Sequence, residues 1–285
     1  MLISPQEMVK GSVRLSSIPE IFFKINDAVN DPECSFGDVA DIINNDTSLS
    51  ARLLKMVNSS FYNFPSKIDS ISHAISIVGT HQLRDLALAT MVMTFFRGIP
   101  EDFVSMKSFW CHSVGCGITG WVLAIHSRQN QAERFYLAGI LHDVGRLIII
   151  ENHPDQAKEI IDLRQDNDEL LNHVEERVMG FDHGAVGAAL TRAWNLPEYL
   201  EEMIEFHHKP LEARNHPTET AILNLADGLS KAMELGCSGE RLVPPLEPGI
   251  WEKVGLPVSL LPSIWDQVQT HFDATIEIFI GDESK

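Results

Sequence analysis

The stretch LAGILHDVGRLIII, residues 137–150, places a histidine and an aspartate side by side within an apolar run. At helical spacing its apolar residues form one broad stripe, made of Leu137, Ile140, Leu141, Val144, Leu147 and Ile148. His142 and Asp143 therefore lie beside or within a buried face. Burying an ionised carboxylate is costly unless it is paired or coordinates a metal ion, so Asp143 requires a partner.

The wider pattern predicts an all-α protein, because nearly every long segment repeats its apolar residues with a helical period. The segment SFGD at 35–38 resembles a capping box that opens a helix through Ile43, and the next helix begins near Asp46 or Ser48 and runs to Asn58. Further predicted helices cover approximately 70–78, 81–96, 103–127, 133–151, 154–164, 168–178, 183–194, 197–207, 217–235 and 259–279. The proline- and glycine-rich segment 236–257 is expected to be mostly loop.

The stretch RGIPED at 97–102 reads as a hinge, and it predicts a helical subdomain over residues 1–100 followed by a second helical domain over residues 101–285. Charge divides unevenly along the chain. Residues 1–100 carry 8 Lys/Arg and 10 Asp/Glu, net −2, whereas residues 101–285 carry 14 and 30, net −16. Such a negative field repels phosphate backbones, so nucleic acid is not expected as a partner.

The composition is that of an ordinary globular chain, with 44% hydrophobic and 22% charged residues. The first residues lack the pattern of an export signal, and no apolar run is long enough to predict a membrane span. The four cysteines form no CxxC pair, which favours free thiols in a reducing compartment. Together these features predict a cytoplasmic protein without a membrane partner.

Further histidines and acids occupy unusual places outside the opening stretch. His112 lies within an apolar segment, His183 begins an apolar helix, and Asp227 is the only charge in AILNLADGLS. His207 and His208 end a predicted helix. Each of these residues alone has an ordinary interpretation, as a core histidine, a helix-terminal residue or a salt-bridged acid. Together, imidazole and carboxylate ligands suit a divalent ion such as Fe, Mn, Zn or Ni, and two carboxylates with several histidines suit one or two ions.

The order His112, His142-Asp143, Asp227 resembles the HD superfamily of metal-dependent phosphohydrolases. His183, His207 and His208 resemble the additional ligands of its HD-GYP branch. A longer similarity, over residues 18 to 208, identifies the chain as a member of the related HDOD domain family. It is carried by IPEIFFKI, DIINNDTSLSARLLKMVNSSFYNFPSKIDSISHAISIVG, LAGILHDVGRL and GFDHGAVGAALTRAWNLPEYLEEMIEFHH. The resemblance implies an N-terminal helical part packed on an HD-like helical part, and a metal site formed by His112, His142, Asp143, His183, His207, His208 and Asp227.

The chain departs from the HD-GYP pattern at three places. Ser108 stands where that branch has a glutamate ligand, Arg146 stands where it has a lysine, and the GYP segment is absent. Losing a carboxylate weakens one metal position, so partial occupancy is expected. Arg146 lies one turn after His142, where it is either a phosphate contact at the mouth of the site or part of a surface salt bridge.

Two functions follow from the resemblance. HDOD domains are generally regulatory, which predicts a signal-transduction module with a vestigial or partly retained metal site and an unidentified signalling protein as its partner. The alternative is a metal-dependent phosphohydrolase acting on a nucleotide or cyclic dinucleotide. The ligand set favours this alternative, whereas the missing glutamate and lysine and the negative charge oppose it, and no residue is assigned as the catalytic acid.

Overall fold

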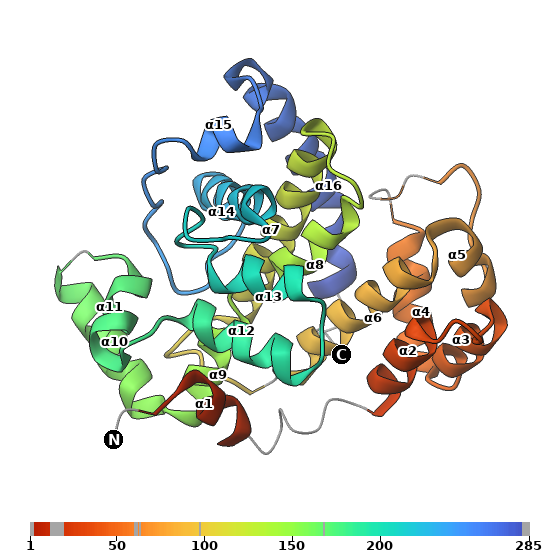
Figure 1. Cartoon of the computed structure of the whole chain (residues 1–285), viewed down its shortest axis with the longest axis horizontal. Coiled ribbons are helices and arrows are strands. Elements are labelled where there is room, and N and C mark those ends of the chain that lie inside the picture. The colour runs from red at the N-terminus through yellow and green to blue at the C-terminus, as the bar shows by residue number, and fades with distance from the viewer. Residues whose placement is uncertain are drawn as a thin grey trace. The chain divides into compact units, whose positions relative to one another are not determined.

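The computed structural model describes residues 3–11, 20–59, 62, 64–96, 98–167 and 169–280; the side chains of residues 11, 165–167 and 277–280 are outside this description. Within these ranges the chain forms helices joined by loops and contains no strand (Figure 1). The all-α prediction is therefore confirmed.

The chain folds as two compact units, Met1–Ser16 with Gly98–Val268 (unit 1) and Ser17–Arg97 with Gln269–Lys285 (unit 2). The division into domains 1–100 and 101–285 stays a prediction. In the structure, Met1–Ser16 belongs to unit 1 together with Gly98–Val268. Arg97 of the hinge segment lies outside the described residues.

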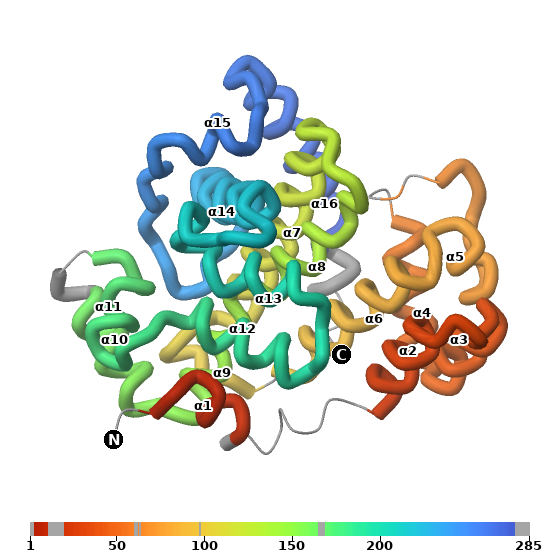
Figure 2. The backbone as a smooth tube through the Cα atoms, viewed as in Figure 1, coloured from red at the N-terminus to blue at the C-terminus, as the bar shows by residue number. Residues whose placement is uncertain are grey.

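Unit 2 is a bundle of short helices, whose path is traced from α2 to α6 in Figure 2. These helices are α2 (Glu20–Asn30), α3 (Phe36–Asn44), α4 (Thr47–Val57), α5 (Ile71–Val78) and α6 (Thr80–Phe95). The predicted caps form. Ser35 and Asp38 make the reciprocal hydrogen bonds of a capping box, and the Asp46 carboxylate accepts from the Leu49 amide. Local sequence signals thus set the ends of these helices.

Unit 1 contains the remaining helices and the apolar stretch on which the sequence analysis opened. They are α1 (Pro5–Gly11), α7 (Met106–His126), α8 (Glu133–Leu141), α9 (Val144–Asn152), α10 (Pro154–Asn167), α11 (Leu171–Met179), α12 (His183–Ala193), α13 (Glu198–Glu205), α14 (Pro217–Ala232), α15 (Ile250–Val254), the short 3-10 helix η2 (Val258–Leu260) and the first part of α16 (Leu261–Ile280). α7 packs against α8 and α14, and α12 packs against α9 and α13.

The single helix predicted over 133–151 is wrong, because the chain breaks between α8 and α9 at His142-Asp143. Asp143 has φ −98° and ψ 0°, outside the helical region, and occupies the position before the first residue of α9. The break turns the two side chains toward the centre of unit 1, where both are fully buried. Continuous apolar periodicity conceals such an interruption.

Glycines bring the helices around this break unusually close together. A Cβ atom at Gly139 would lie 2.4 Å from the Cα atom of Gly117, and one at Gly145 would lie 2.0 Å from the carbonyl oxygen of His183. Only a residue without a Cβ permits these approaches. Gly139 therefore fixes α8 against α7, and Gly145 fixes α9 against α12.

Helix α7 is long and apolar enough to cross a membrane by length and composition alone. Of the 18-residue apolar stretch that meets this criterion, 78% is buried inside the structure. It carries His112, which is fully buried with it. The helix has the burial expected of a core helix.

Candidate metal centre

The structure brings together the seven side chains that the sequence singled out, from separate elements of unit 1. His112 comes from α7, His142 and Asp143 from the α8–α9 break, His183 from the first position of α12, and Asp227 from α14. His207 and His208 follow α13, which ends two residues earlier than the predicted 207. All except the partly buried His208 are at most 1% exposed.

Two groups of ligands share Asp143. The first, here called the Asp227 half-site, contains His112, His142, Asp143 and Asp227. The Nε2 atom of His112 lies 3.1 Å from Asp227 Oδ1 and 3.5 Å from Asp143 Oδ2, and that of His142 lies 3.6 Å and 3.1 Å from the same two oxygens. Both histidine Nε2 atoms thus lie within 3.6 Å of an oxygen of each carboxylate.

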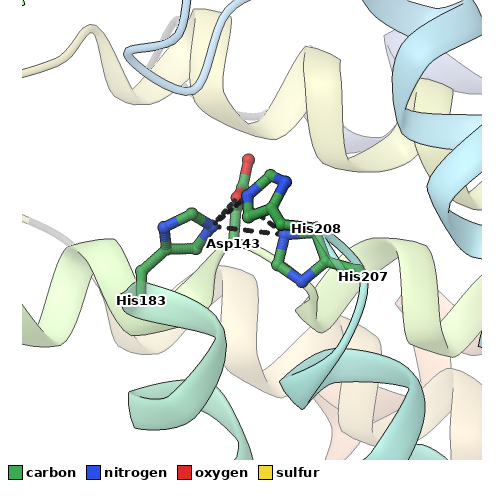
Figure 3. Close-up of side chains that lie close together, drawn as sticks. All are labelled: Asp143, His183, His207 and His208. Carbon is green, nitrogen blue, oxygen red and sulfur yellow. Dashed lines mark hydrogen bonds and ion pairs between the residues drawn. The ribbon is translucent and has the colours of Figure 1, made fainter. Parts of the chain in front are cut away.

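The second group, here called the His208 half-site, contains Asp143, His183, His207 and His208 (Figure 3). It uses the other oxygen of the shared carboxylate: Asp143 Oδ1 lies 2.9 Å from His183 Nε2 and 3.9 Å from His207 Nε2. The Nε2 atom of His183 also lies 3.2 Å from that of His207 and 3.0 Å from that of His208. Asp143 is therefore placed to bridge two half-sites.

The opposite ring nitrogens of three histidines are held by acceptors. Nδ1 of His142 lies 2.7 Å from the Gly139 carbonyl oxygen, Nδ1 of His207 lies 2.7 Å from that of Ile204, and Nδ1 of His183 lies 2.6 Å from Glu175 Oε2. If each Nδ1–H donates to its acceptor, the neutral ring presents an unprotonated Nε2 to the centre, as metal-ligating histidines do. Nitrogen lone pairs that face one another at about 3 Å repel unless a cation lies among them.

The charges around the centre also favour a cation among these side chains. Burial alone would raise the pKa values of Asp143 and Asp227. For Asp143, the nearby Arg146 and His142 outweigh burial and hold the pKa well below its usual range. For Asp227, Lys231 and His112 have the same effect. Burial lowers the pKa of His142, yet Asp143, Cys116 and Asp227 together outweigh burial and raise that pKa well above its ordinary value. The carboxylates thus demand a positive charge between them, from a proton or a metal ion.

Two histidines of the His208 half-site, His207 and His208, are kept neutral. Burial and Arg146 lower the pKa of the third, His183, but Glu175 and Asp143 outweigh them and raise that pKa. Burial, together with His142 and His183, holds the pKa of His207 well below its usual range, and burial with His207 and His183 does the same for His208. A neutral imidazole is the form that binds a metal ion. Nε2 of His142, both oxygens of Asp143 and Oδ1 of Asp227 are buried without a hydrogen-bond partner. The donor set and these unsatisfied atoms therefore fit a divalent cation.

Two charged residues that the sequence analysis did not select complete the centre. Glu175 on α11 is 3% exposed, and its Oε2 accepts from both the backbone amide and the ring of His183. Lys231 donates to Asp227 Oδ2 at 2.5 Å, one turn along α14. The spacing of Asp227 and Lys231 could have revealed this pair from the sequence, whereas Glu175 lies in a segment with many charges and carries no such signal.

Arg146 is buried beside the centre, so its interpretation as a surface salt bridge is wrong. It is 4% exposed, and its Nε lies 3.6 Å from Asp143 Oδ1 and 3.7 Å from Glu175 Oε1. Its Nη1 donates to the hydroxyl of Ser238 at 2.9 Å. Ser238 belongs to the loop 236–257, whose first part therefore packs across unit 1 next to the centre.

The sequence model of the HDOD domain family matches residues 15–210. A protein of Treponema pallidum (strain Nichols), named only as uncharacterized, is 26% identical over 200 residues, which are 68% of this chain and 38% of that protein. The chain thus spans less than half the length of this curated relative.

Solved structures show the same fold. An HDOD domain protein of unknown function from Geobacter sulfurreducens superposes with a TM-score of 0.75 at 24% identity, covering 92% of this chain and 93% of that one. A candidate phosphohydrolase from Shewanella amazonensis SB2B gives a TM-score of 0.74 at 22% identity, covering 94% and 97%. Because the family match extends over more than half of the sequence, the chain belongs to the HDOD domain family.

Proposed function

We propose that this chain is a signal-transduction module that holds a divalent metal ion tightly at the Asp227 half-site and a second one more weakly at the His208 half-site, and that it acts on an unidentified signalling protein. The observation that carries the proposal is the Asp143 carboxylate, which directs one oxygen toward each group of histidines. Fe, Mn, Zn or Ni suits this mixed imidazole and carboxylate set. The seven candidate ligands support metal binding. Ser108 supplies no carboxylate at the position where the HD-GYP branch has a glutamate ligand, and this absence favours a regulatory role over a catalytic one.

Charge favours unequal occupancy of the half-sites. Lys231 lies against Asp227, and Arg146 lies near the Asp143 oxygen that faces the His208 half-site. Three buried carboxylates, those of Asp143, Asp227 and Glu175, are thus offset by two buried cations. The net charge of this set is −1, so one divalent ion changes it to +1, whereas two change it to +3, an excess of positive charge that an anion must offset. We therefore expect one tightly held ion, at the Asp227 half-site, where two carboxylates meet.

Unit 2 is the part we assign to the signalling partner. Among the described residues, the groups able to hold a metal lie in unit 1. Both units expose large apolar side chains, and the most exposed among the described residues is Phe36 of unit 2, at 68%, on the same unit as Phe23 and Ile77. Exposed apolar side chains of this size are common in surfaces that bind other proteins.

A second candidate is a metal-dependent phosphohydrolase, and one observation favours it. A cavity of about 350 Å³ adjoins the centre, and Arg146 and Glu175 contribute to its lining. In such an enzyme the metal ions would supply an activated water and charge neutralisation. Arg146 would hold the phosphate, and Glu175 would keep His183 oriented toward Asp143.

One experiment separates the two candidates. The protein is purified without chelator, its metal content is measured, and turnover of cyclic dinucleotides, nucleotides and a generic phosphodiester is assayed with added Mn(II) or Fe(II). The regulatory proposal expects bound metal without turnover. Turnover that disappears in His142→Ala and Asp143→Ala would replace it with the hydrolase, and absence of metal under every condition would refute both.

A further inference from the structure

The cavity beside Arg146 has features that the metal centre alone does not explain. It lies wholly within unit 1, between the segment 101–108, helices α9, α10 and α11, and the loop 237–241. One part of its wall is aliphatic, formed by Ile149, Ile160, Ile161 and Leu171. The rest of the lining includes polar and charged side chains, among them Arg146. A volume of about 350 Å³ is enough for a small organic molecule.

Arg146 brings unsatisfied hydrogen-bond donors to this cavity. Its Nη1 is bound to Ser238, but Nε and Nη2 are buried without a hydrogen-bond partner. Among the described residues that line the cavity, these are the buried side-chain nitrogen or oxygen atoms left unpartnered. Nε already faces the carboxylates of Asp143 and Glu175 at 3.6 Å and 3.7 Å, so Nη2 is the donor that requires an acceptor, and an oxyanion matches the planar guanidinium.

The other charged groups of the lining are already engaged or lie at the rim. Arg164 pairs with Glu240 at 3.2 Å, and Glu175 accepts from His183. Glu101, Asp102 and Arg241 are exposed. Three arginines and three acids line the cavity, so its formal charge is zero. This balance favours a singly charged head group over a polyphosphate or a nucleic acid.

We propose that this cavity binds a small amphipathic anion, whose oxyanion head contacts Arg146 and whose apolar body lies against Ile149, Ile160 and Ile161. The ligand would be either a substrate or a regulator of the neighbouring metal centre. This role rests on the proposed function, whereas the binding of the anion in the cavity does not. Carboxylates and phosphate monoesters share the required chemistry.

The test uses simple probes on the full chain. Binding of 1-naphthoate, 1-naphthyl phosphate, neutral 1-naphthol and inorganic phosphate is measured by calorimetry on chelator-treated protein and on manganese-loaded protein. We expect one site per chain for either or both naphthyl anions, and affinity lower by roughly tenfold or more for 1-naphthol and for inorganic phosphate, since each lacks one half of the recognised chemistry. Comparison of the two naphthyl anions identifies the preferred head group.

Two variants localise the binding. Arg146→Lys keeps the charge but loses the planar fork, and should weaken the naphthyl anions by roughly tenfold. Ala157→Leu, on the lining, should weaken them by reducing the space for the body. Arg177→Lys, whose side chain pairs with Glu169 at the surface, is the matched control and should change nothing.

Equal binding of 1-naphthol and 1-naphthoate, or full binding in both Arg146→Lys and Ala157→Leu, would overturn the proposal. If Arg146→Lys does not fold, the probe series and Ala157→Leu still decide. Manganese binding is measured on the same preparations. Intact manganese binding without probe binding therefore refutes only the cavity, and probe binding without manganese binding refutes only the metal centre.

Discussion

Gly145 and His183 lie in backbone contact, because a Cβ atom at position 145 would lie 2.0 Å from the His183 carbonyl oxygen. The contact sets the distance between α9 and α12, and with it the 2.9 Å between Asp143 Oδ1 and His183 Nε2. Packing of two helices thus determines the geometry of the candidate centre. Small residues at such contacts allow the backbones to approach closely.

Gly145→Ala should therefore disturb both folding and metal binding. Overpacking of this kind typically costs about 1–3 kcal/mol, and here the backbone must move. We expect a lower midpoint in urea and a loss of metal from the His208 half-site. Gly228→Ala is the control, because its Cβ would meet nothing within 4 Å and its helix should gain stability. Equal behaviour of the two variants would contradict this account.

Asp143→Ala and Asp227→Ala should differ in metal stoichiometry. Asp143 faces both half-sites, whereas Asp227 contacts only His112 and His142 among the seven candidate ligands. We expect Asp143→Ala to lose metal from both half-sites and Asp227→Ala to retain binding by His183, His207 and His208. Metal analysis after equilibration with Mn(II) or Zn(II) and gel filtration measures this difference. Identical stoichiometry in the two variants would argue against Asp143 as a bridge.

The sequence predicted the composition of the candidate centre more completely than its architecture. Histidines and aspartates in apolar segments are conspicuous, and the resemblance to the HD superfamily added His207 and His208, so all seven candidate ligands could be named. The break at His142-Asp143 could not be predicted, since the apolar period continues through it. Nor could the roles of Glu175, which lies beside Arg146 and His183, and of Ser238, which accepts from Arg146, be predicted. Residue type shows in sequence, but contacts between distant segments depend on tertiary packing.

Glu175→Gln should weaken metal binding although Glu175 is not one of the seven candidate ligands. Its carboxylate orients His183 and increases the basicity of that ring. Loss of such an outer partner typically costs about 10–100-fold in metal affinity. Glu176→Gln is the neighbouring control, since Glu176 pairs with Lys209 at the surface. Competition with a chromogenic chelator measures both affinities, and equal values would remove Glu175 from the centre.

Lys231→Met should have opposite effects with and without metal. Without metal, Asp227 Oδ2 loses its buried partner, which typically costs about 3–5 kcal/mol. With metal, removal of a neighbouring positive charge should strengthen cation binding at the Asp227 half-site. We therefore expect a lower Tm for chelator-treated protein and a larger rise in Tm on adding Mn(II). Lys209→Met, which removes a partly exposed cation, should alter neither value appreciably. An unchanged metal-induced shift in Lys231→Met would show that Lys231 does not oppose the cation.

Glu202 should make stability depend on pH through the loop that follows the histidine pair. Burial raises its pKa, but its carboxylate accepts from the backbone amides of Arg214, Asn215 and His216, and these bonds lower the pKa below 4.5. Because folding favours the ionised form, the stabilisation is fully present above pH 4.5 and is lost as pH falls through the lowered pKa. Glu202→Gln should cost about 1–3 kcal/mol in unfolding free energy at pH 7, and the difference from the unmodified protein should shrink as the pH falls below 4.5 and through the lowered pKa.

Urea unfolding of chelator-treated protein between pH 7 and pH 3 measures this dependence, with Glu201→Gln as the control on the same helix. Glu201 pairs with Arg192, whose side chain is half exposed. Loss of this ion pair in Glu201→Gln should therefore lower the unfolding free energy at pH 7 less than Glu202→Gln does. A difference between Glu202→Gln and the unmodified protein that stays constant to pH 3 would show that the Glu202 carboxylate does not hold the loop in its ionised form. The loop leads directly into α14, so loss of this anchor should also reduce metal binding at Asp227.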